Sequence, residues 1–317
     1  MERQSTVTGP QGTLPGTHRF RHLAMGTTFE IFAAIADGRY AEHAAYAAFE
    51  ELDRIERQLS RYIENSDISR ISSLPADQAL RVGLDTFQCL ELSCDLWVET
   101  HGAFDVTVGS LLDCFREHSS PSSETLRSIG ERMGMNLVEL DPSEHSVRLR
   151  RSPIRIDLGG IGKGYAVDRM AAMLCEWSIE TALVHAGHSS VVALAPPRRT
   201  KGWPIVLKSE RGAGGTLVRF DLQNSSVSGS GLRKGKHIVD PRTGRYVEER
   251  QAAWCRGPNA AVTDALSTAF MVMSPEEIEK YCVRHPDIAA ITVVTQAKDG
   301  TQTEQVLRFG DWEGATS

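Results

Sequence analysis

Residues 156–168 have the sequence IDLGGIGKGYAVD, in which a short apolar run enters a glycine-rich turn and a helical pattern follows. Glycines allow backbone N–H and C=O groups to approach a ligand closely, and the N-terminus of a helix favours phosphate. Lys163 adds a positive charge, but no Ser or Thr follows it, so the stretch is not a Walker A loop. On these residues alone, a phosphate-binding turn and a purely structural tight turn are equally good interpretations.

Hydrophobic periodicity around this stretch predicts a mixture of helices and strands. Three- and four-residue spacing of apolar side chains predicts helices over 40–59, 84–100, 164–177 and 260–273, a weaker one over 124–134, and one that starts at Ser274. Short β-like runs predict strands near 27–35, 137–140, 146–150, 154–158, 182–185, 191–195, 205–208, 217–222, 288–295 and 305–309. No regular βαβ alternation is present, so the pattern indicates an α+β fold.

Composition restricts the class of protein. The chain has 317 residues, of which 41% are hydrophobic and 24% are charged, as in a folded protein with a large core. A net charge of −6 makes non-specific nucleic-acid binding a poor hypothesis. None of the six cysteines has C-x-x-C spacing, so we expect free buried thiols. We expect residues 1–20 to be a flexible N-terminal segment and residues 21–317 to form a single domain.

Residues 1–21 are polar and lack the apolar core of a signal peptide, and no uncharged apolar run is long enough for a membrane span. These features predict a cytoplasmic protein.

Two further clusters contain chemically useful side chains. Asp264 and Thr268 are four residues apart on a predicted helix and share a face, and their oxygens suit Mg²⁺. On residue types alone, a first-turn acid and a polar spacer are the better interpretation of this pair. His237 precedes a Pro-x-x-Gly turn and is a candidate general base or ligand contact, or an exposed hairpin residue. The small polar run 225–231 is either a donor of hydrogen bonds to phosphate or a flexible turn.

Six collinear segments give the chain a resemblance to a known family. They are MGT (25–27), LSRYIENSDIS (59–69), GAFDVTVG (102–109), DLGGIGKGYAVD (157–168), HIVDPRTG (237–244) and DALSTAF (264–270). Together they resemble the ApbE family of flavin transferases, the FAD:protein FMN transferases. The resemblance implies a fold of mixed and antiparallel sheets packed against helices. It also implies Mg²⁺-dependent transfer of the FMN half of FAD to a Thr or Ser of an acceptor flavoprotein, with release of AMP.

The resemblance also implies roles for individual residues. Metal ligands would be the side chains of Asp264 and Thr268 and the carbonyl of Gly162. Met25 and Tyr62 would flank the isoalloxazine ring. Further contacts to the flavin nucleotide would come from Ala103, Phe104, Asp105, Gly159, Lys163 and Tyr165. His237 would lie beside the flavin phosphates as the candidate base, so that His237 and Asp264 are the expected catalytic residues.

The chain also departs from the family pattern. Gly162 stands where the family usually has Ala, and His185-Ala186-Gly187-His188-Ser189 replaces a usual Asn-x-Gly-Gly-Asp. The stretch 229–237 is shorter than usual, and no lipobox is present. The altered 185–189 segment and the short 229–237 stretch favour one alternative, a non-catalytic FAD-binding protein. A further alternative is an FAD pyrophosphatase that uses the same metal site and yields AMP and FMN.

Overall fold

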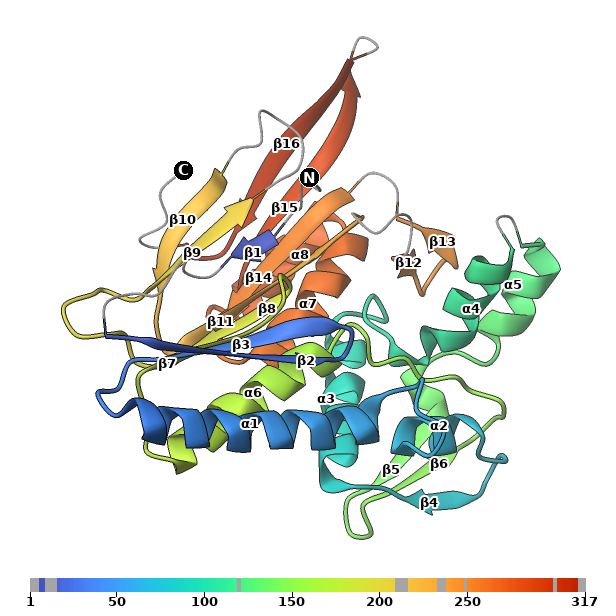
Figure 1. Cartoon of the computed structure of the whole chain (residues 1–317). Helices are drawn as coiled ribbons and strands as arrows, with labels where there is room; N and C mark the ends of the chain where they lie inside the picture. Colours follow the sequence, from blue (N-terminus) through green and yellow to red (C-terminus); the bar gives the residue numbers. More distant parts are fainter. Residues whose placement is uncertain are drawn as a thin grey trace.

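An eight-stranded antiparallel sheet organises the protein (Figure 1). The computed structural model describes residues 6–8, 16–118, 121–208, 216–232, 238–247, 250–298 and 301–312. In spatial order, the strands of the main sheet are β16 (Thr301–Phe309), β15 (Ala289–Lys298), β14 (Arg250–Gly257), β11 (Ser225–Gly231), β8 (Ser190–Ala193), β7 (Ala182–Ala186), β3 (Thr27–Ala33) and β2 (His18–Ala24). Each neighbouring pair is antiparallel.

Helices cover one face of this sheet (Figure 1). The helices that pack in this layer are α1 (Gly38–Leu59), α3 (Leu84–Glu99), α6 (Gly162–Glu176), α7 (Ala260–Val272) and α8 (Pro275–Arg284). The α1 helix begins at an Asp37 cap and buries an apolar stripe that includes Leu52 and Ile55. In contrast, α7 is buried on most of its surface because it lies between the sheet and two other helices, α3 and α6.

The opposite face of the main sheet packs against a second sheet of β1 (Thr6–Thr8), β9 (Trp203–Lys208) and β10 (Thr216–Leu222). Strand alternation separates the two cores. In β3, Phe29 and Ile31 belong to the core on the helix side, whereas Phe32 belongs to the core shared with β9 and β10. Both β1 and the start of β2 lie within residues 1–20, where the sequence predicts no strand.

Smaller elements lie beside this layered unit (Figure 1). They are α2 (Asp67–Ser72), α4 (Gly109–Glu117), α5 (Ser123–Gly130), the 3₁₀ turns Val106–Val108 and Met135–Leu137, the sheet of β4 (Ala79–Arg81), β6 (Ser146–Leu149) and β5 (Val138–Asp141), and the hairpin of β12 (Val239–Asp240) and β13 (Arg245–Tyr246). Among the described residues, no helix combines the length and the apolar character needed to cross a bilayer.

The α+β fold with mixed helices and antiparallel sheets is confirmed. The prediction of a strand over 154–158 is wrong, because its backbone groups bond residues of helices and of a 3₁₀ turn instead of a neighbouring strand. Ile156 N donates to Ser72 Oγ at 3.2 Å, and Asp157 N donates to Val106 O at 2.7 Å. The helix predicted over 124–134 ends earlier, at Gly130. The polar run 225–231 forms the central strand β11, a possibility that its small side chains did not indicate.

Candidate active site

The glycine turn before α6 is held by backbone and side-chain contacts within itself. Leu158 O accepts a hydrogen bond from Gly162 N at 2.7 Å, so the chain enters α6 directly. Asp157 Oδ1 accepts from Gly159 N at 2.8 Å, and Lys163 Nζ donates to Gly159 O at 2.9 Å. The turn is therefore ordered by its own residues, with Lys163 in the first turn of the helix.

At Gly164, α6 and α7 approach so closely that a side chain would not fit. A Cβ atom there would lie 2.1 Å from Ala260 O and 2.7 Å from Asp264 Cβ. The Gly164 N–H donates to Asp264 Oδ2 at 3.0 Å. Further along α6, the Asp168 carboxylate accepts from Ala260 N and Ala261 N, both at 2.8 Å, and so caps the N-terminus of α7. The glycine motif and the Asp264 motif thus form one structural unit.

Asp264 has a buried carboxylate, with 4% of its side chain exposed. Burial raises its pKa, and the Lys163 ammonium, with Nζ 3.8 Å from Oδ2, and the Gly164 N–H act in the opposite direction. Removing a carboxylate from water is costly unless positive charge lies beside it. Lys163 therefore supplies positive charge beside this buried carboxylate.

Thr268 lies one helical turn after Asp264 on the same face of α7. Its Oγ1 is 3.3 Å from Asp264 O and 3.1 Å from Ser230 Oγ on β11. A Cβ atom on Gly160 would lie 3.2 Å from this hydroxyl oxygen. Gly160 and Gly164, which flank Gly162, therefore contact the two α7 residues predicted as metal ligands.

These oxygens fit a hard divalent cation. Among the described residues, no group of three or more His, Cys, Asp or Glu side chains could hold a metal ion by itself. A carboxylate, a hydroxyl and a main-chain carbonyl form a partial oxygen set, and Mg²⁺ commonly completes such a set with waters and substrate phosphates. The donor set at Asp264 and Thr268 is thus suited to a metal that binds together with a phosphate-containing substrate.

Tyr62 follows α1 and presents its ring to solvent, with 75% of the residue exposed. The preceding Arg61 is mostly buried and pairs with Asp157 Oδ2 at 2.7 Å and Asp113 Oδ2 at 2.5 Å. Its guanidinium carbon also lies 5.7 Å from the centre of the Tyr62 ring. Because Asp157 also bonds the glycine turn, Arg61 connects the exposed Tyr62 to that turn.

The loop after α3 carries three buried residues, Ala103, Phe104 and Asp105. The Phe104 ring borders the glycine turn, since a Cβ on Gly160 would lie 3.3 Å from its Cε2 atom. Asp105 accepts from Thr107 N at 2.8 Å, from Thr107 Oγ1 at 2.6 Å and from Trp97 Nε1 at 3.1 Å. Burial raises the pKa of Asp105, and these three hydrogen bonds lower it. Asp105 therefore shapes the loop through bonds within the protein.

Met25 occupies the tight turn between β2 and β3. Met25 and Gly26 both have positive φ values, 48° and 70°, as the two central residues of a hairpin turn often do. Met25 N donates to Glu56 Oε1 on α1 at 2.7 Å. The turn after β7 packs against the same hairpin, because a Cβ on Gly187 would lie 2.2 Å from Thr27 Oγ1.

The hydroxyl of Tyr165 points to α3 and not to the glycine turn. It lies 2.9 Å from Asp85 Oδ1 and 3.0 Å from Gln88 Oε1. Burial and the neighbouring Asp85 carboxylate raise the pKa of Tyr165, so the phenol stays neutral. The resemblance implies a flavin contact for Tyr165, whereas the hydroxyl joins α6 to α3.

Sequence comparison assigns the chain to a family, because a sequence model of the ApbE family matches residues 25–292. The chain belongs to the ApbE family. An FAD:protein FMN transferase of Klebsiella pneumoniae (strain 342) is 24% identical over 293 residues, which cover 86% of this chain and 83% of the relative. The enzyme of the same name from Escherichia coli (strain K12) is 23% identical over 90% of this chain and 86% of its own length.

Solved ApbE structures have the same fold. The apo form of the Pseudomonas stutzeri flavinyl transferase ApbE superposes with a TM-score of 0.82 at 24% identity, covering 92% of this chain and 94% of the other. The ApbE protein of Thermotoga maritima superposes with a TM-score of 0.80 at 26% identity, covering 92% of this chain and 97% of the other.

The structure describes the surroundings of two departures from the ApbE pattern, Gly162 and His185. A Cβ on Gly162 would meet only Leu158 Cβ, at 3.8 Å, so Gly and Ala are both accommodated there. His185 Nε2 pairs with Glu30 Oε2 at 2.8 Å on the sheet face opposite α6 and α7. His237 and residues 233–236 of the shortened stretch before it lie outside the described residues.

Three residues that organise this ApbE site were not predicted from the sequence. Arg61 lies within the 59–69 motif, and Asp168 lies at the end of the glycine stretch. Ser230 was one of several small residues in 225–231. Burying a charge without a partner costs free energy, so the charged residues Arg61 and Asp168 within these motifs are candidates for ion pairs or capping contacts. Local sequence contains no comparable signal for Ser230.

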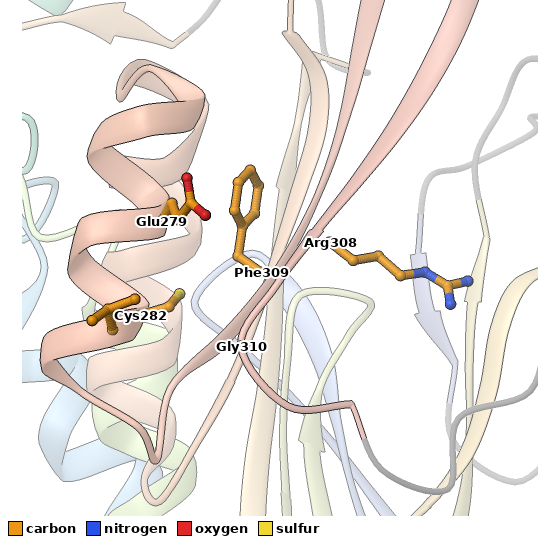
Figure 2. A pocket seen from close by; sticks show the side chains of 6 residues that line it. Glu279, Cys282, Arg308, Phe309 and Gly310 are labelled. Carbon is orange, nitrogen blue, oxygen red and sulfur yellow. The ribbon is translucent and has the colours of Figure 1, made fainter.

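A separate pocket of about 200 Å³ lies between α8 and β16 (Figure 2). Glu279 and Cys282 of α8 face Phe309 across it, while the Arg308 side chain points to the other side of the strand (Figure 2). Burial raises the pKa of the Cys282 thiol to about 12, so it is not a thiolate near neutral pH. None of its lining residues belongs to the motifs described above, so this pocket is distinct from the candidate active site.

Proposed function

We propose that this protein is an FAD:protein FMN transferase that uses Mg²⁺. In the proposed reaction, a Thr or Ser hydroxyl of an acceptor protein attacks the FMN-side phosphorus of FAD, the pyrophosphate bond breaks, and AMP leaves. The observation that carries the proposal is the contact of the glycine turn and Lys163 with the buried Asp264 carboxylate and the Thr268 hydroxyl. The names of the ApbE relatives support it.

The proposed roles follow from charge and position. Asp264, Thr268 and the carbonyl of Gly162 would hold the metal, which when bound would neutralise phosphate charge as a Lewis acid. Lys163, in the first turn of α6, would hold the pyrophosphate through its positive charge. Tyr62 offers an exposed ring for stacking on the isoalloxazine.

The remaining proposed contacts surround the same unit. They are Met25 at the isoalloxazine and Ala103, Phe104, Asp105, Gly159 and Tyr165 at the flavin nucleotide. For Asp105 and Tyr165 the proposed contribution is to shape and support the site, since both side chains are bonded within the protein. His237 remains the proposed base that accepts the hydroxyl proton of the acceptor.

The test is one incubation of purified protein with FAD and a peptide that carries an acceptor motif of the family, with and without Mg²⁺. Chromatography with intact-mass detection would follow AMP, FMN and the peptide. We expect AMP release and an FMN-sized mass gain on the peptide only with Mg²⁺. AMP and FMN with an unmodified peptide would instead indicate a pyrophosphatase, and bound but intact FAD would indicate a non-catalytic flavin-binding protein.

Matched variants link this outcome to the site. Asp264→Ala should abolish the Mg²⁺-dependent release of AMP. Asp95→Ala, which removes an exposed carboxylate on α3, should leave it unchanged. Equal activity in both variants would contradict the assignment of the metal site.

A further inference from the structure

A row of hydroxyl groups connects β11 to the two α7 residues of the proposed metal site. Ser230 Oγ lies 3.1 Å from Thr268 Oγ1 and 2.8 Å from Ser267 Oγ. Ser267 Oγ in turn lies 2.8 Å from the main-chain oxygen of Asp264. The row therefore starts at one proposed metal ligand and ends at the backbone of the other.

The direction of the hydrogen bonds in this row follows from the donor inventory. A carbonyl oxygen only accepts, so the 2.8 Å contact makes Ser267 the donor to Asp264 O. The single proton of Ser267 is then used, and Ser267 accepts from Ser230 at 2.8 Å. The proton of Ser230 is used in the same way. Thr268 then has two acceptors, Ser230 Oγ at 3.1 Å and Asp264 O at 3.3 Å, and Ser230 is the nearer one.

This direction determines what Thr268 can offer to a metal. With its proton directed to the nearer acceptor, Ser230, the lone pairs of the Thr268 oxygen stay free for a cation. Hydrogen-bond chains of this kind strengthen each member, because every hydroxyl donates and accepts. Without Ser230, the remaining acceptor for the Thr268 proton is Asp264 O, at the longer distance of 3.3 Å and already bonded to Ser267.

We propose that Ser230 is a positioning residue that orients the Thr268 hydroxyl for metal binding. This inference rests on the proposed function, because it assumes that Thr268 binds the metal. Partners that orient a metal ligand typically account for about 10- to 100-fold in metal affinity or activity. Ser230→Ala should therefore weaken metal binding by about tenfold while leaving the fold intact.

Strand β11 provides a matched control. Ser228 lies two residues earlier on the same face and bonds Thr263 Oγ1 of α7 at 2.9 Å, away from Thr268. Ser228→Ala therefore removes an equivalent strand-to-helix hydroxyl contact without touching the proposed ligands. Ser230→Thr keeps a hydroxyl at position 230 and should restore metal binding.

The experiment titrates each full-length variant with Mn²⁺, with and without FAD, and measures the free-ion signal by electron paramagnetic resonance. Thermal unfolding of the same samples measures stability, and AMP release measures turnover. We expect the dissociation constant for Mn²⁺ to rise about tenfold in Ser230→Ala, and to stay at the wild-type value in Ser228→Ala and Ser230→Thr.

Other outcomes separate the two proposals. If the Mn²⁺ affinity of Ser230→Ala equals that of the wild type, or if Ser228→Ala weakens it equally, the positioning role is wrong while the proposed function stands. If wild-type protein binds no Mn²⁺ and releases no AMP, the proposed function fails and this inference fails with it. Asp264→Asn should lose Mn²⁺ binding whatever stands at position 230.

Discussion

Gly164 lies against Ala260 so closely that a Cβ atom at position 164 would be 2.1 Å from the Ala260 carbonyl oxygen. This contact sets the spacing between α6 and α7, and with it the 3.8 Å distance between Lys163 Nζ and Asp264 Oδ2. The absence of a side chain at position 164 is thus a condition for placing the ammonium and carboxylate together.

Replacing Gly164 by Ala should destabilise the protein by about 1–3 kcal/mol or more, because backbone atoms of α7 must move to make room. Chemical denaturation would measure the change in the free energy of unfolding. Gly130→Ala, at the end of α5, is the control, since a Cβ there would meet nothing within 4 Å. The control should be neutral or slightly stabilising. A neutral Gly164→Ala would show that the two helices are not held this closely.

Tyr62→Ala should weaken FAD binding about three- to tenfold, the scale of one aromatic stacking contact. The ring is 75% exposed, so the free energy of unfolding should change by less than about 0.5 kcal/mol. Fluorescence titration with FAD and thermal unfolding would measure the two effects separately. Tyr46→Ala, on α1 and 61% exposed, should change neither quantity. Unchanged FAD affinity in Tyr62→Ala would remove Tyr62 from the flavin site.

Arg61→Ala should cost about 1–3 kcal/mol of stability, because Asp157 loses its buried cationic partner, whereas Asp113 keeps Arg116 at 3.1 Å. The same variant should raise the KM for FAD, since Asp157 also holds the glycine turn. Denaturation and steady-state kinetics would test these two expectations.

The comparison for Arg61 is Arg150→Ala, which breaks an ion pair with Glu139 between side chains that are 59% and 41% exposed. Such a surface pair is worth about 0–1 kcal/mol. Similar losses in the two variants would mean that the Arg61 pairs contribute no more than a surface pair.

Glu30→Gln should make the free energy of unfolding less dependent on pH under acidic conditions. Burial raises the pKa of Glu30, but the hydrogen bonds and charges of His185 and Arg19 outweigh it and lower the pKa from 4.5 to about 2. Because the folded-state pKa is the lower one, the ionised carboxylate stabilises the protein above pH 4.5, and this contribution is lost as the pH falls towards 2.

The variant should therefore be less stable by about 2 kcal/mol at pH 7 and should show a flatter stability curve between about pH 5 and 2. Denaturant titrations across this range would give both quantities. Glu139→Gln, an exposed carboxylate, is the control. If the stability of the wild type and of Glu30→Gln depends on pH in the same way, the ion pairs of Glu30 with Arg19 and His185 do not stabilise the protein.

Much of the helical layer was predictable because its signals are local. The apolar spacing of 40–59, 84–100 and 260–273 agrees with α1, α3 and α7 to within a few residues. The glycine turn leading into α6 was also predicted, since glycine and helix-start signals lie next to each other in the chain. Three statements stay predictions: a flexible segment over residues 1–20 followed by a single domain, the cytoplasmic location, and the role of His237.

The strands were harder to predict because their hydrogen-bond partners are distant in sequence. Residues 154–158 look like a strand, yet their backbone groups bond helices and a 3₁₀ turn. Residues 225–231 look like a flexible turn, yet they pair with β8 and β14. Pairing energy comes from neighbours that a local pattern does not contain.

The sequence by itself determined which chemical groups the protein carries and, through six collinear motifs, its family. Only the tertiary structure decided which of these groups meet. It joined the glycine turn to Asp264 by the close approach of two helices, directed the Tyr165 hydroxyl to Asp85, and placed Ser230 beside Thr268. Contacts between residues tens of positions apart depend on packing and burial across elements, and the spacing of residues within one element does not specify them.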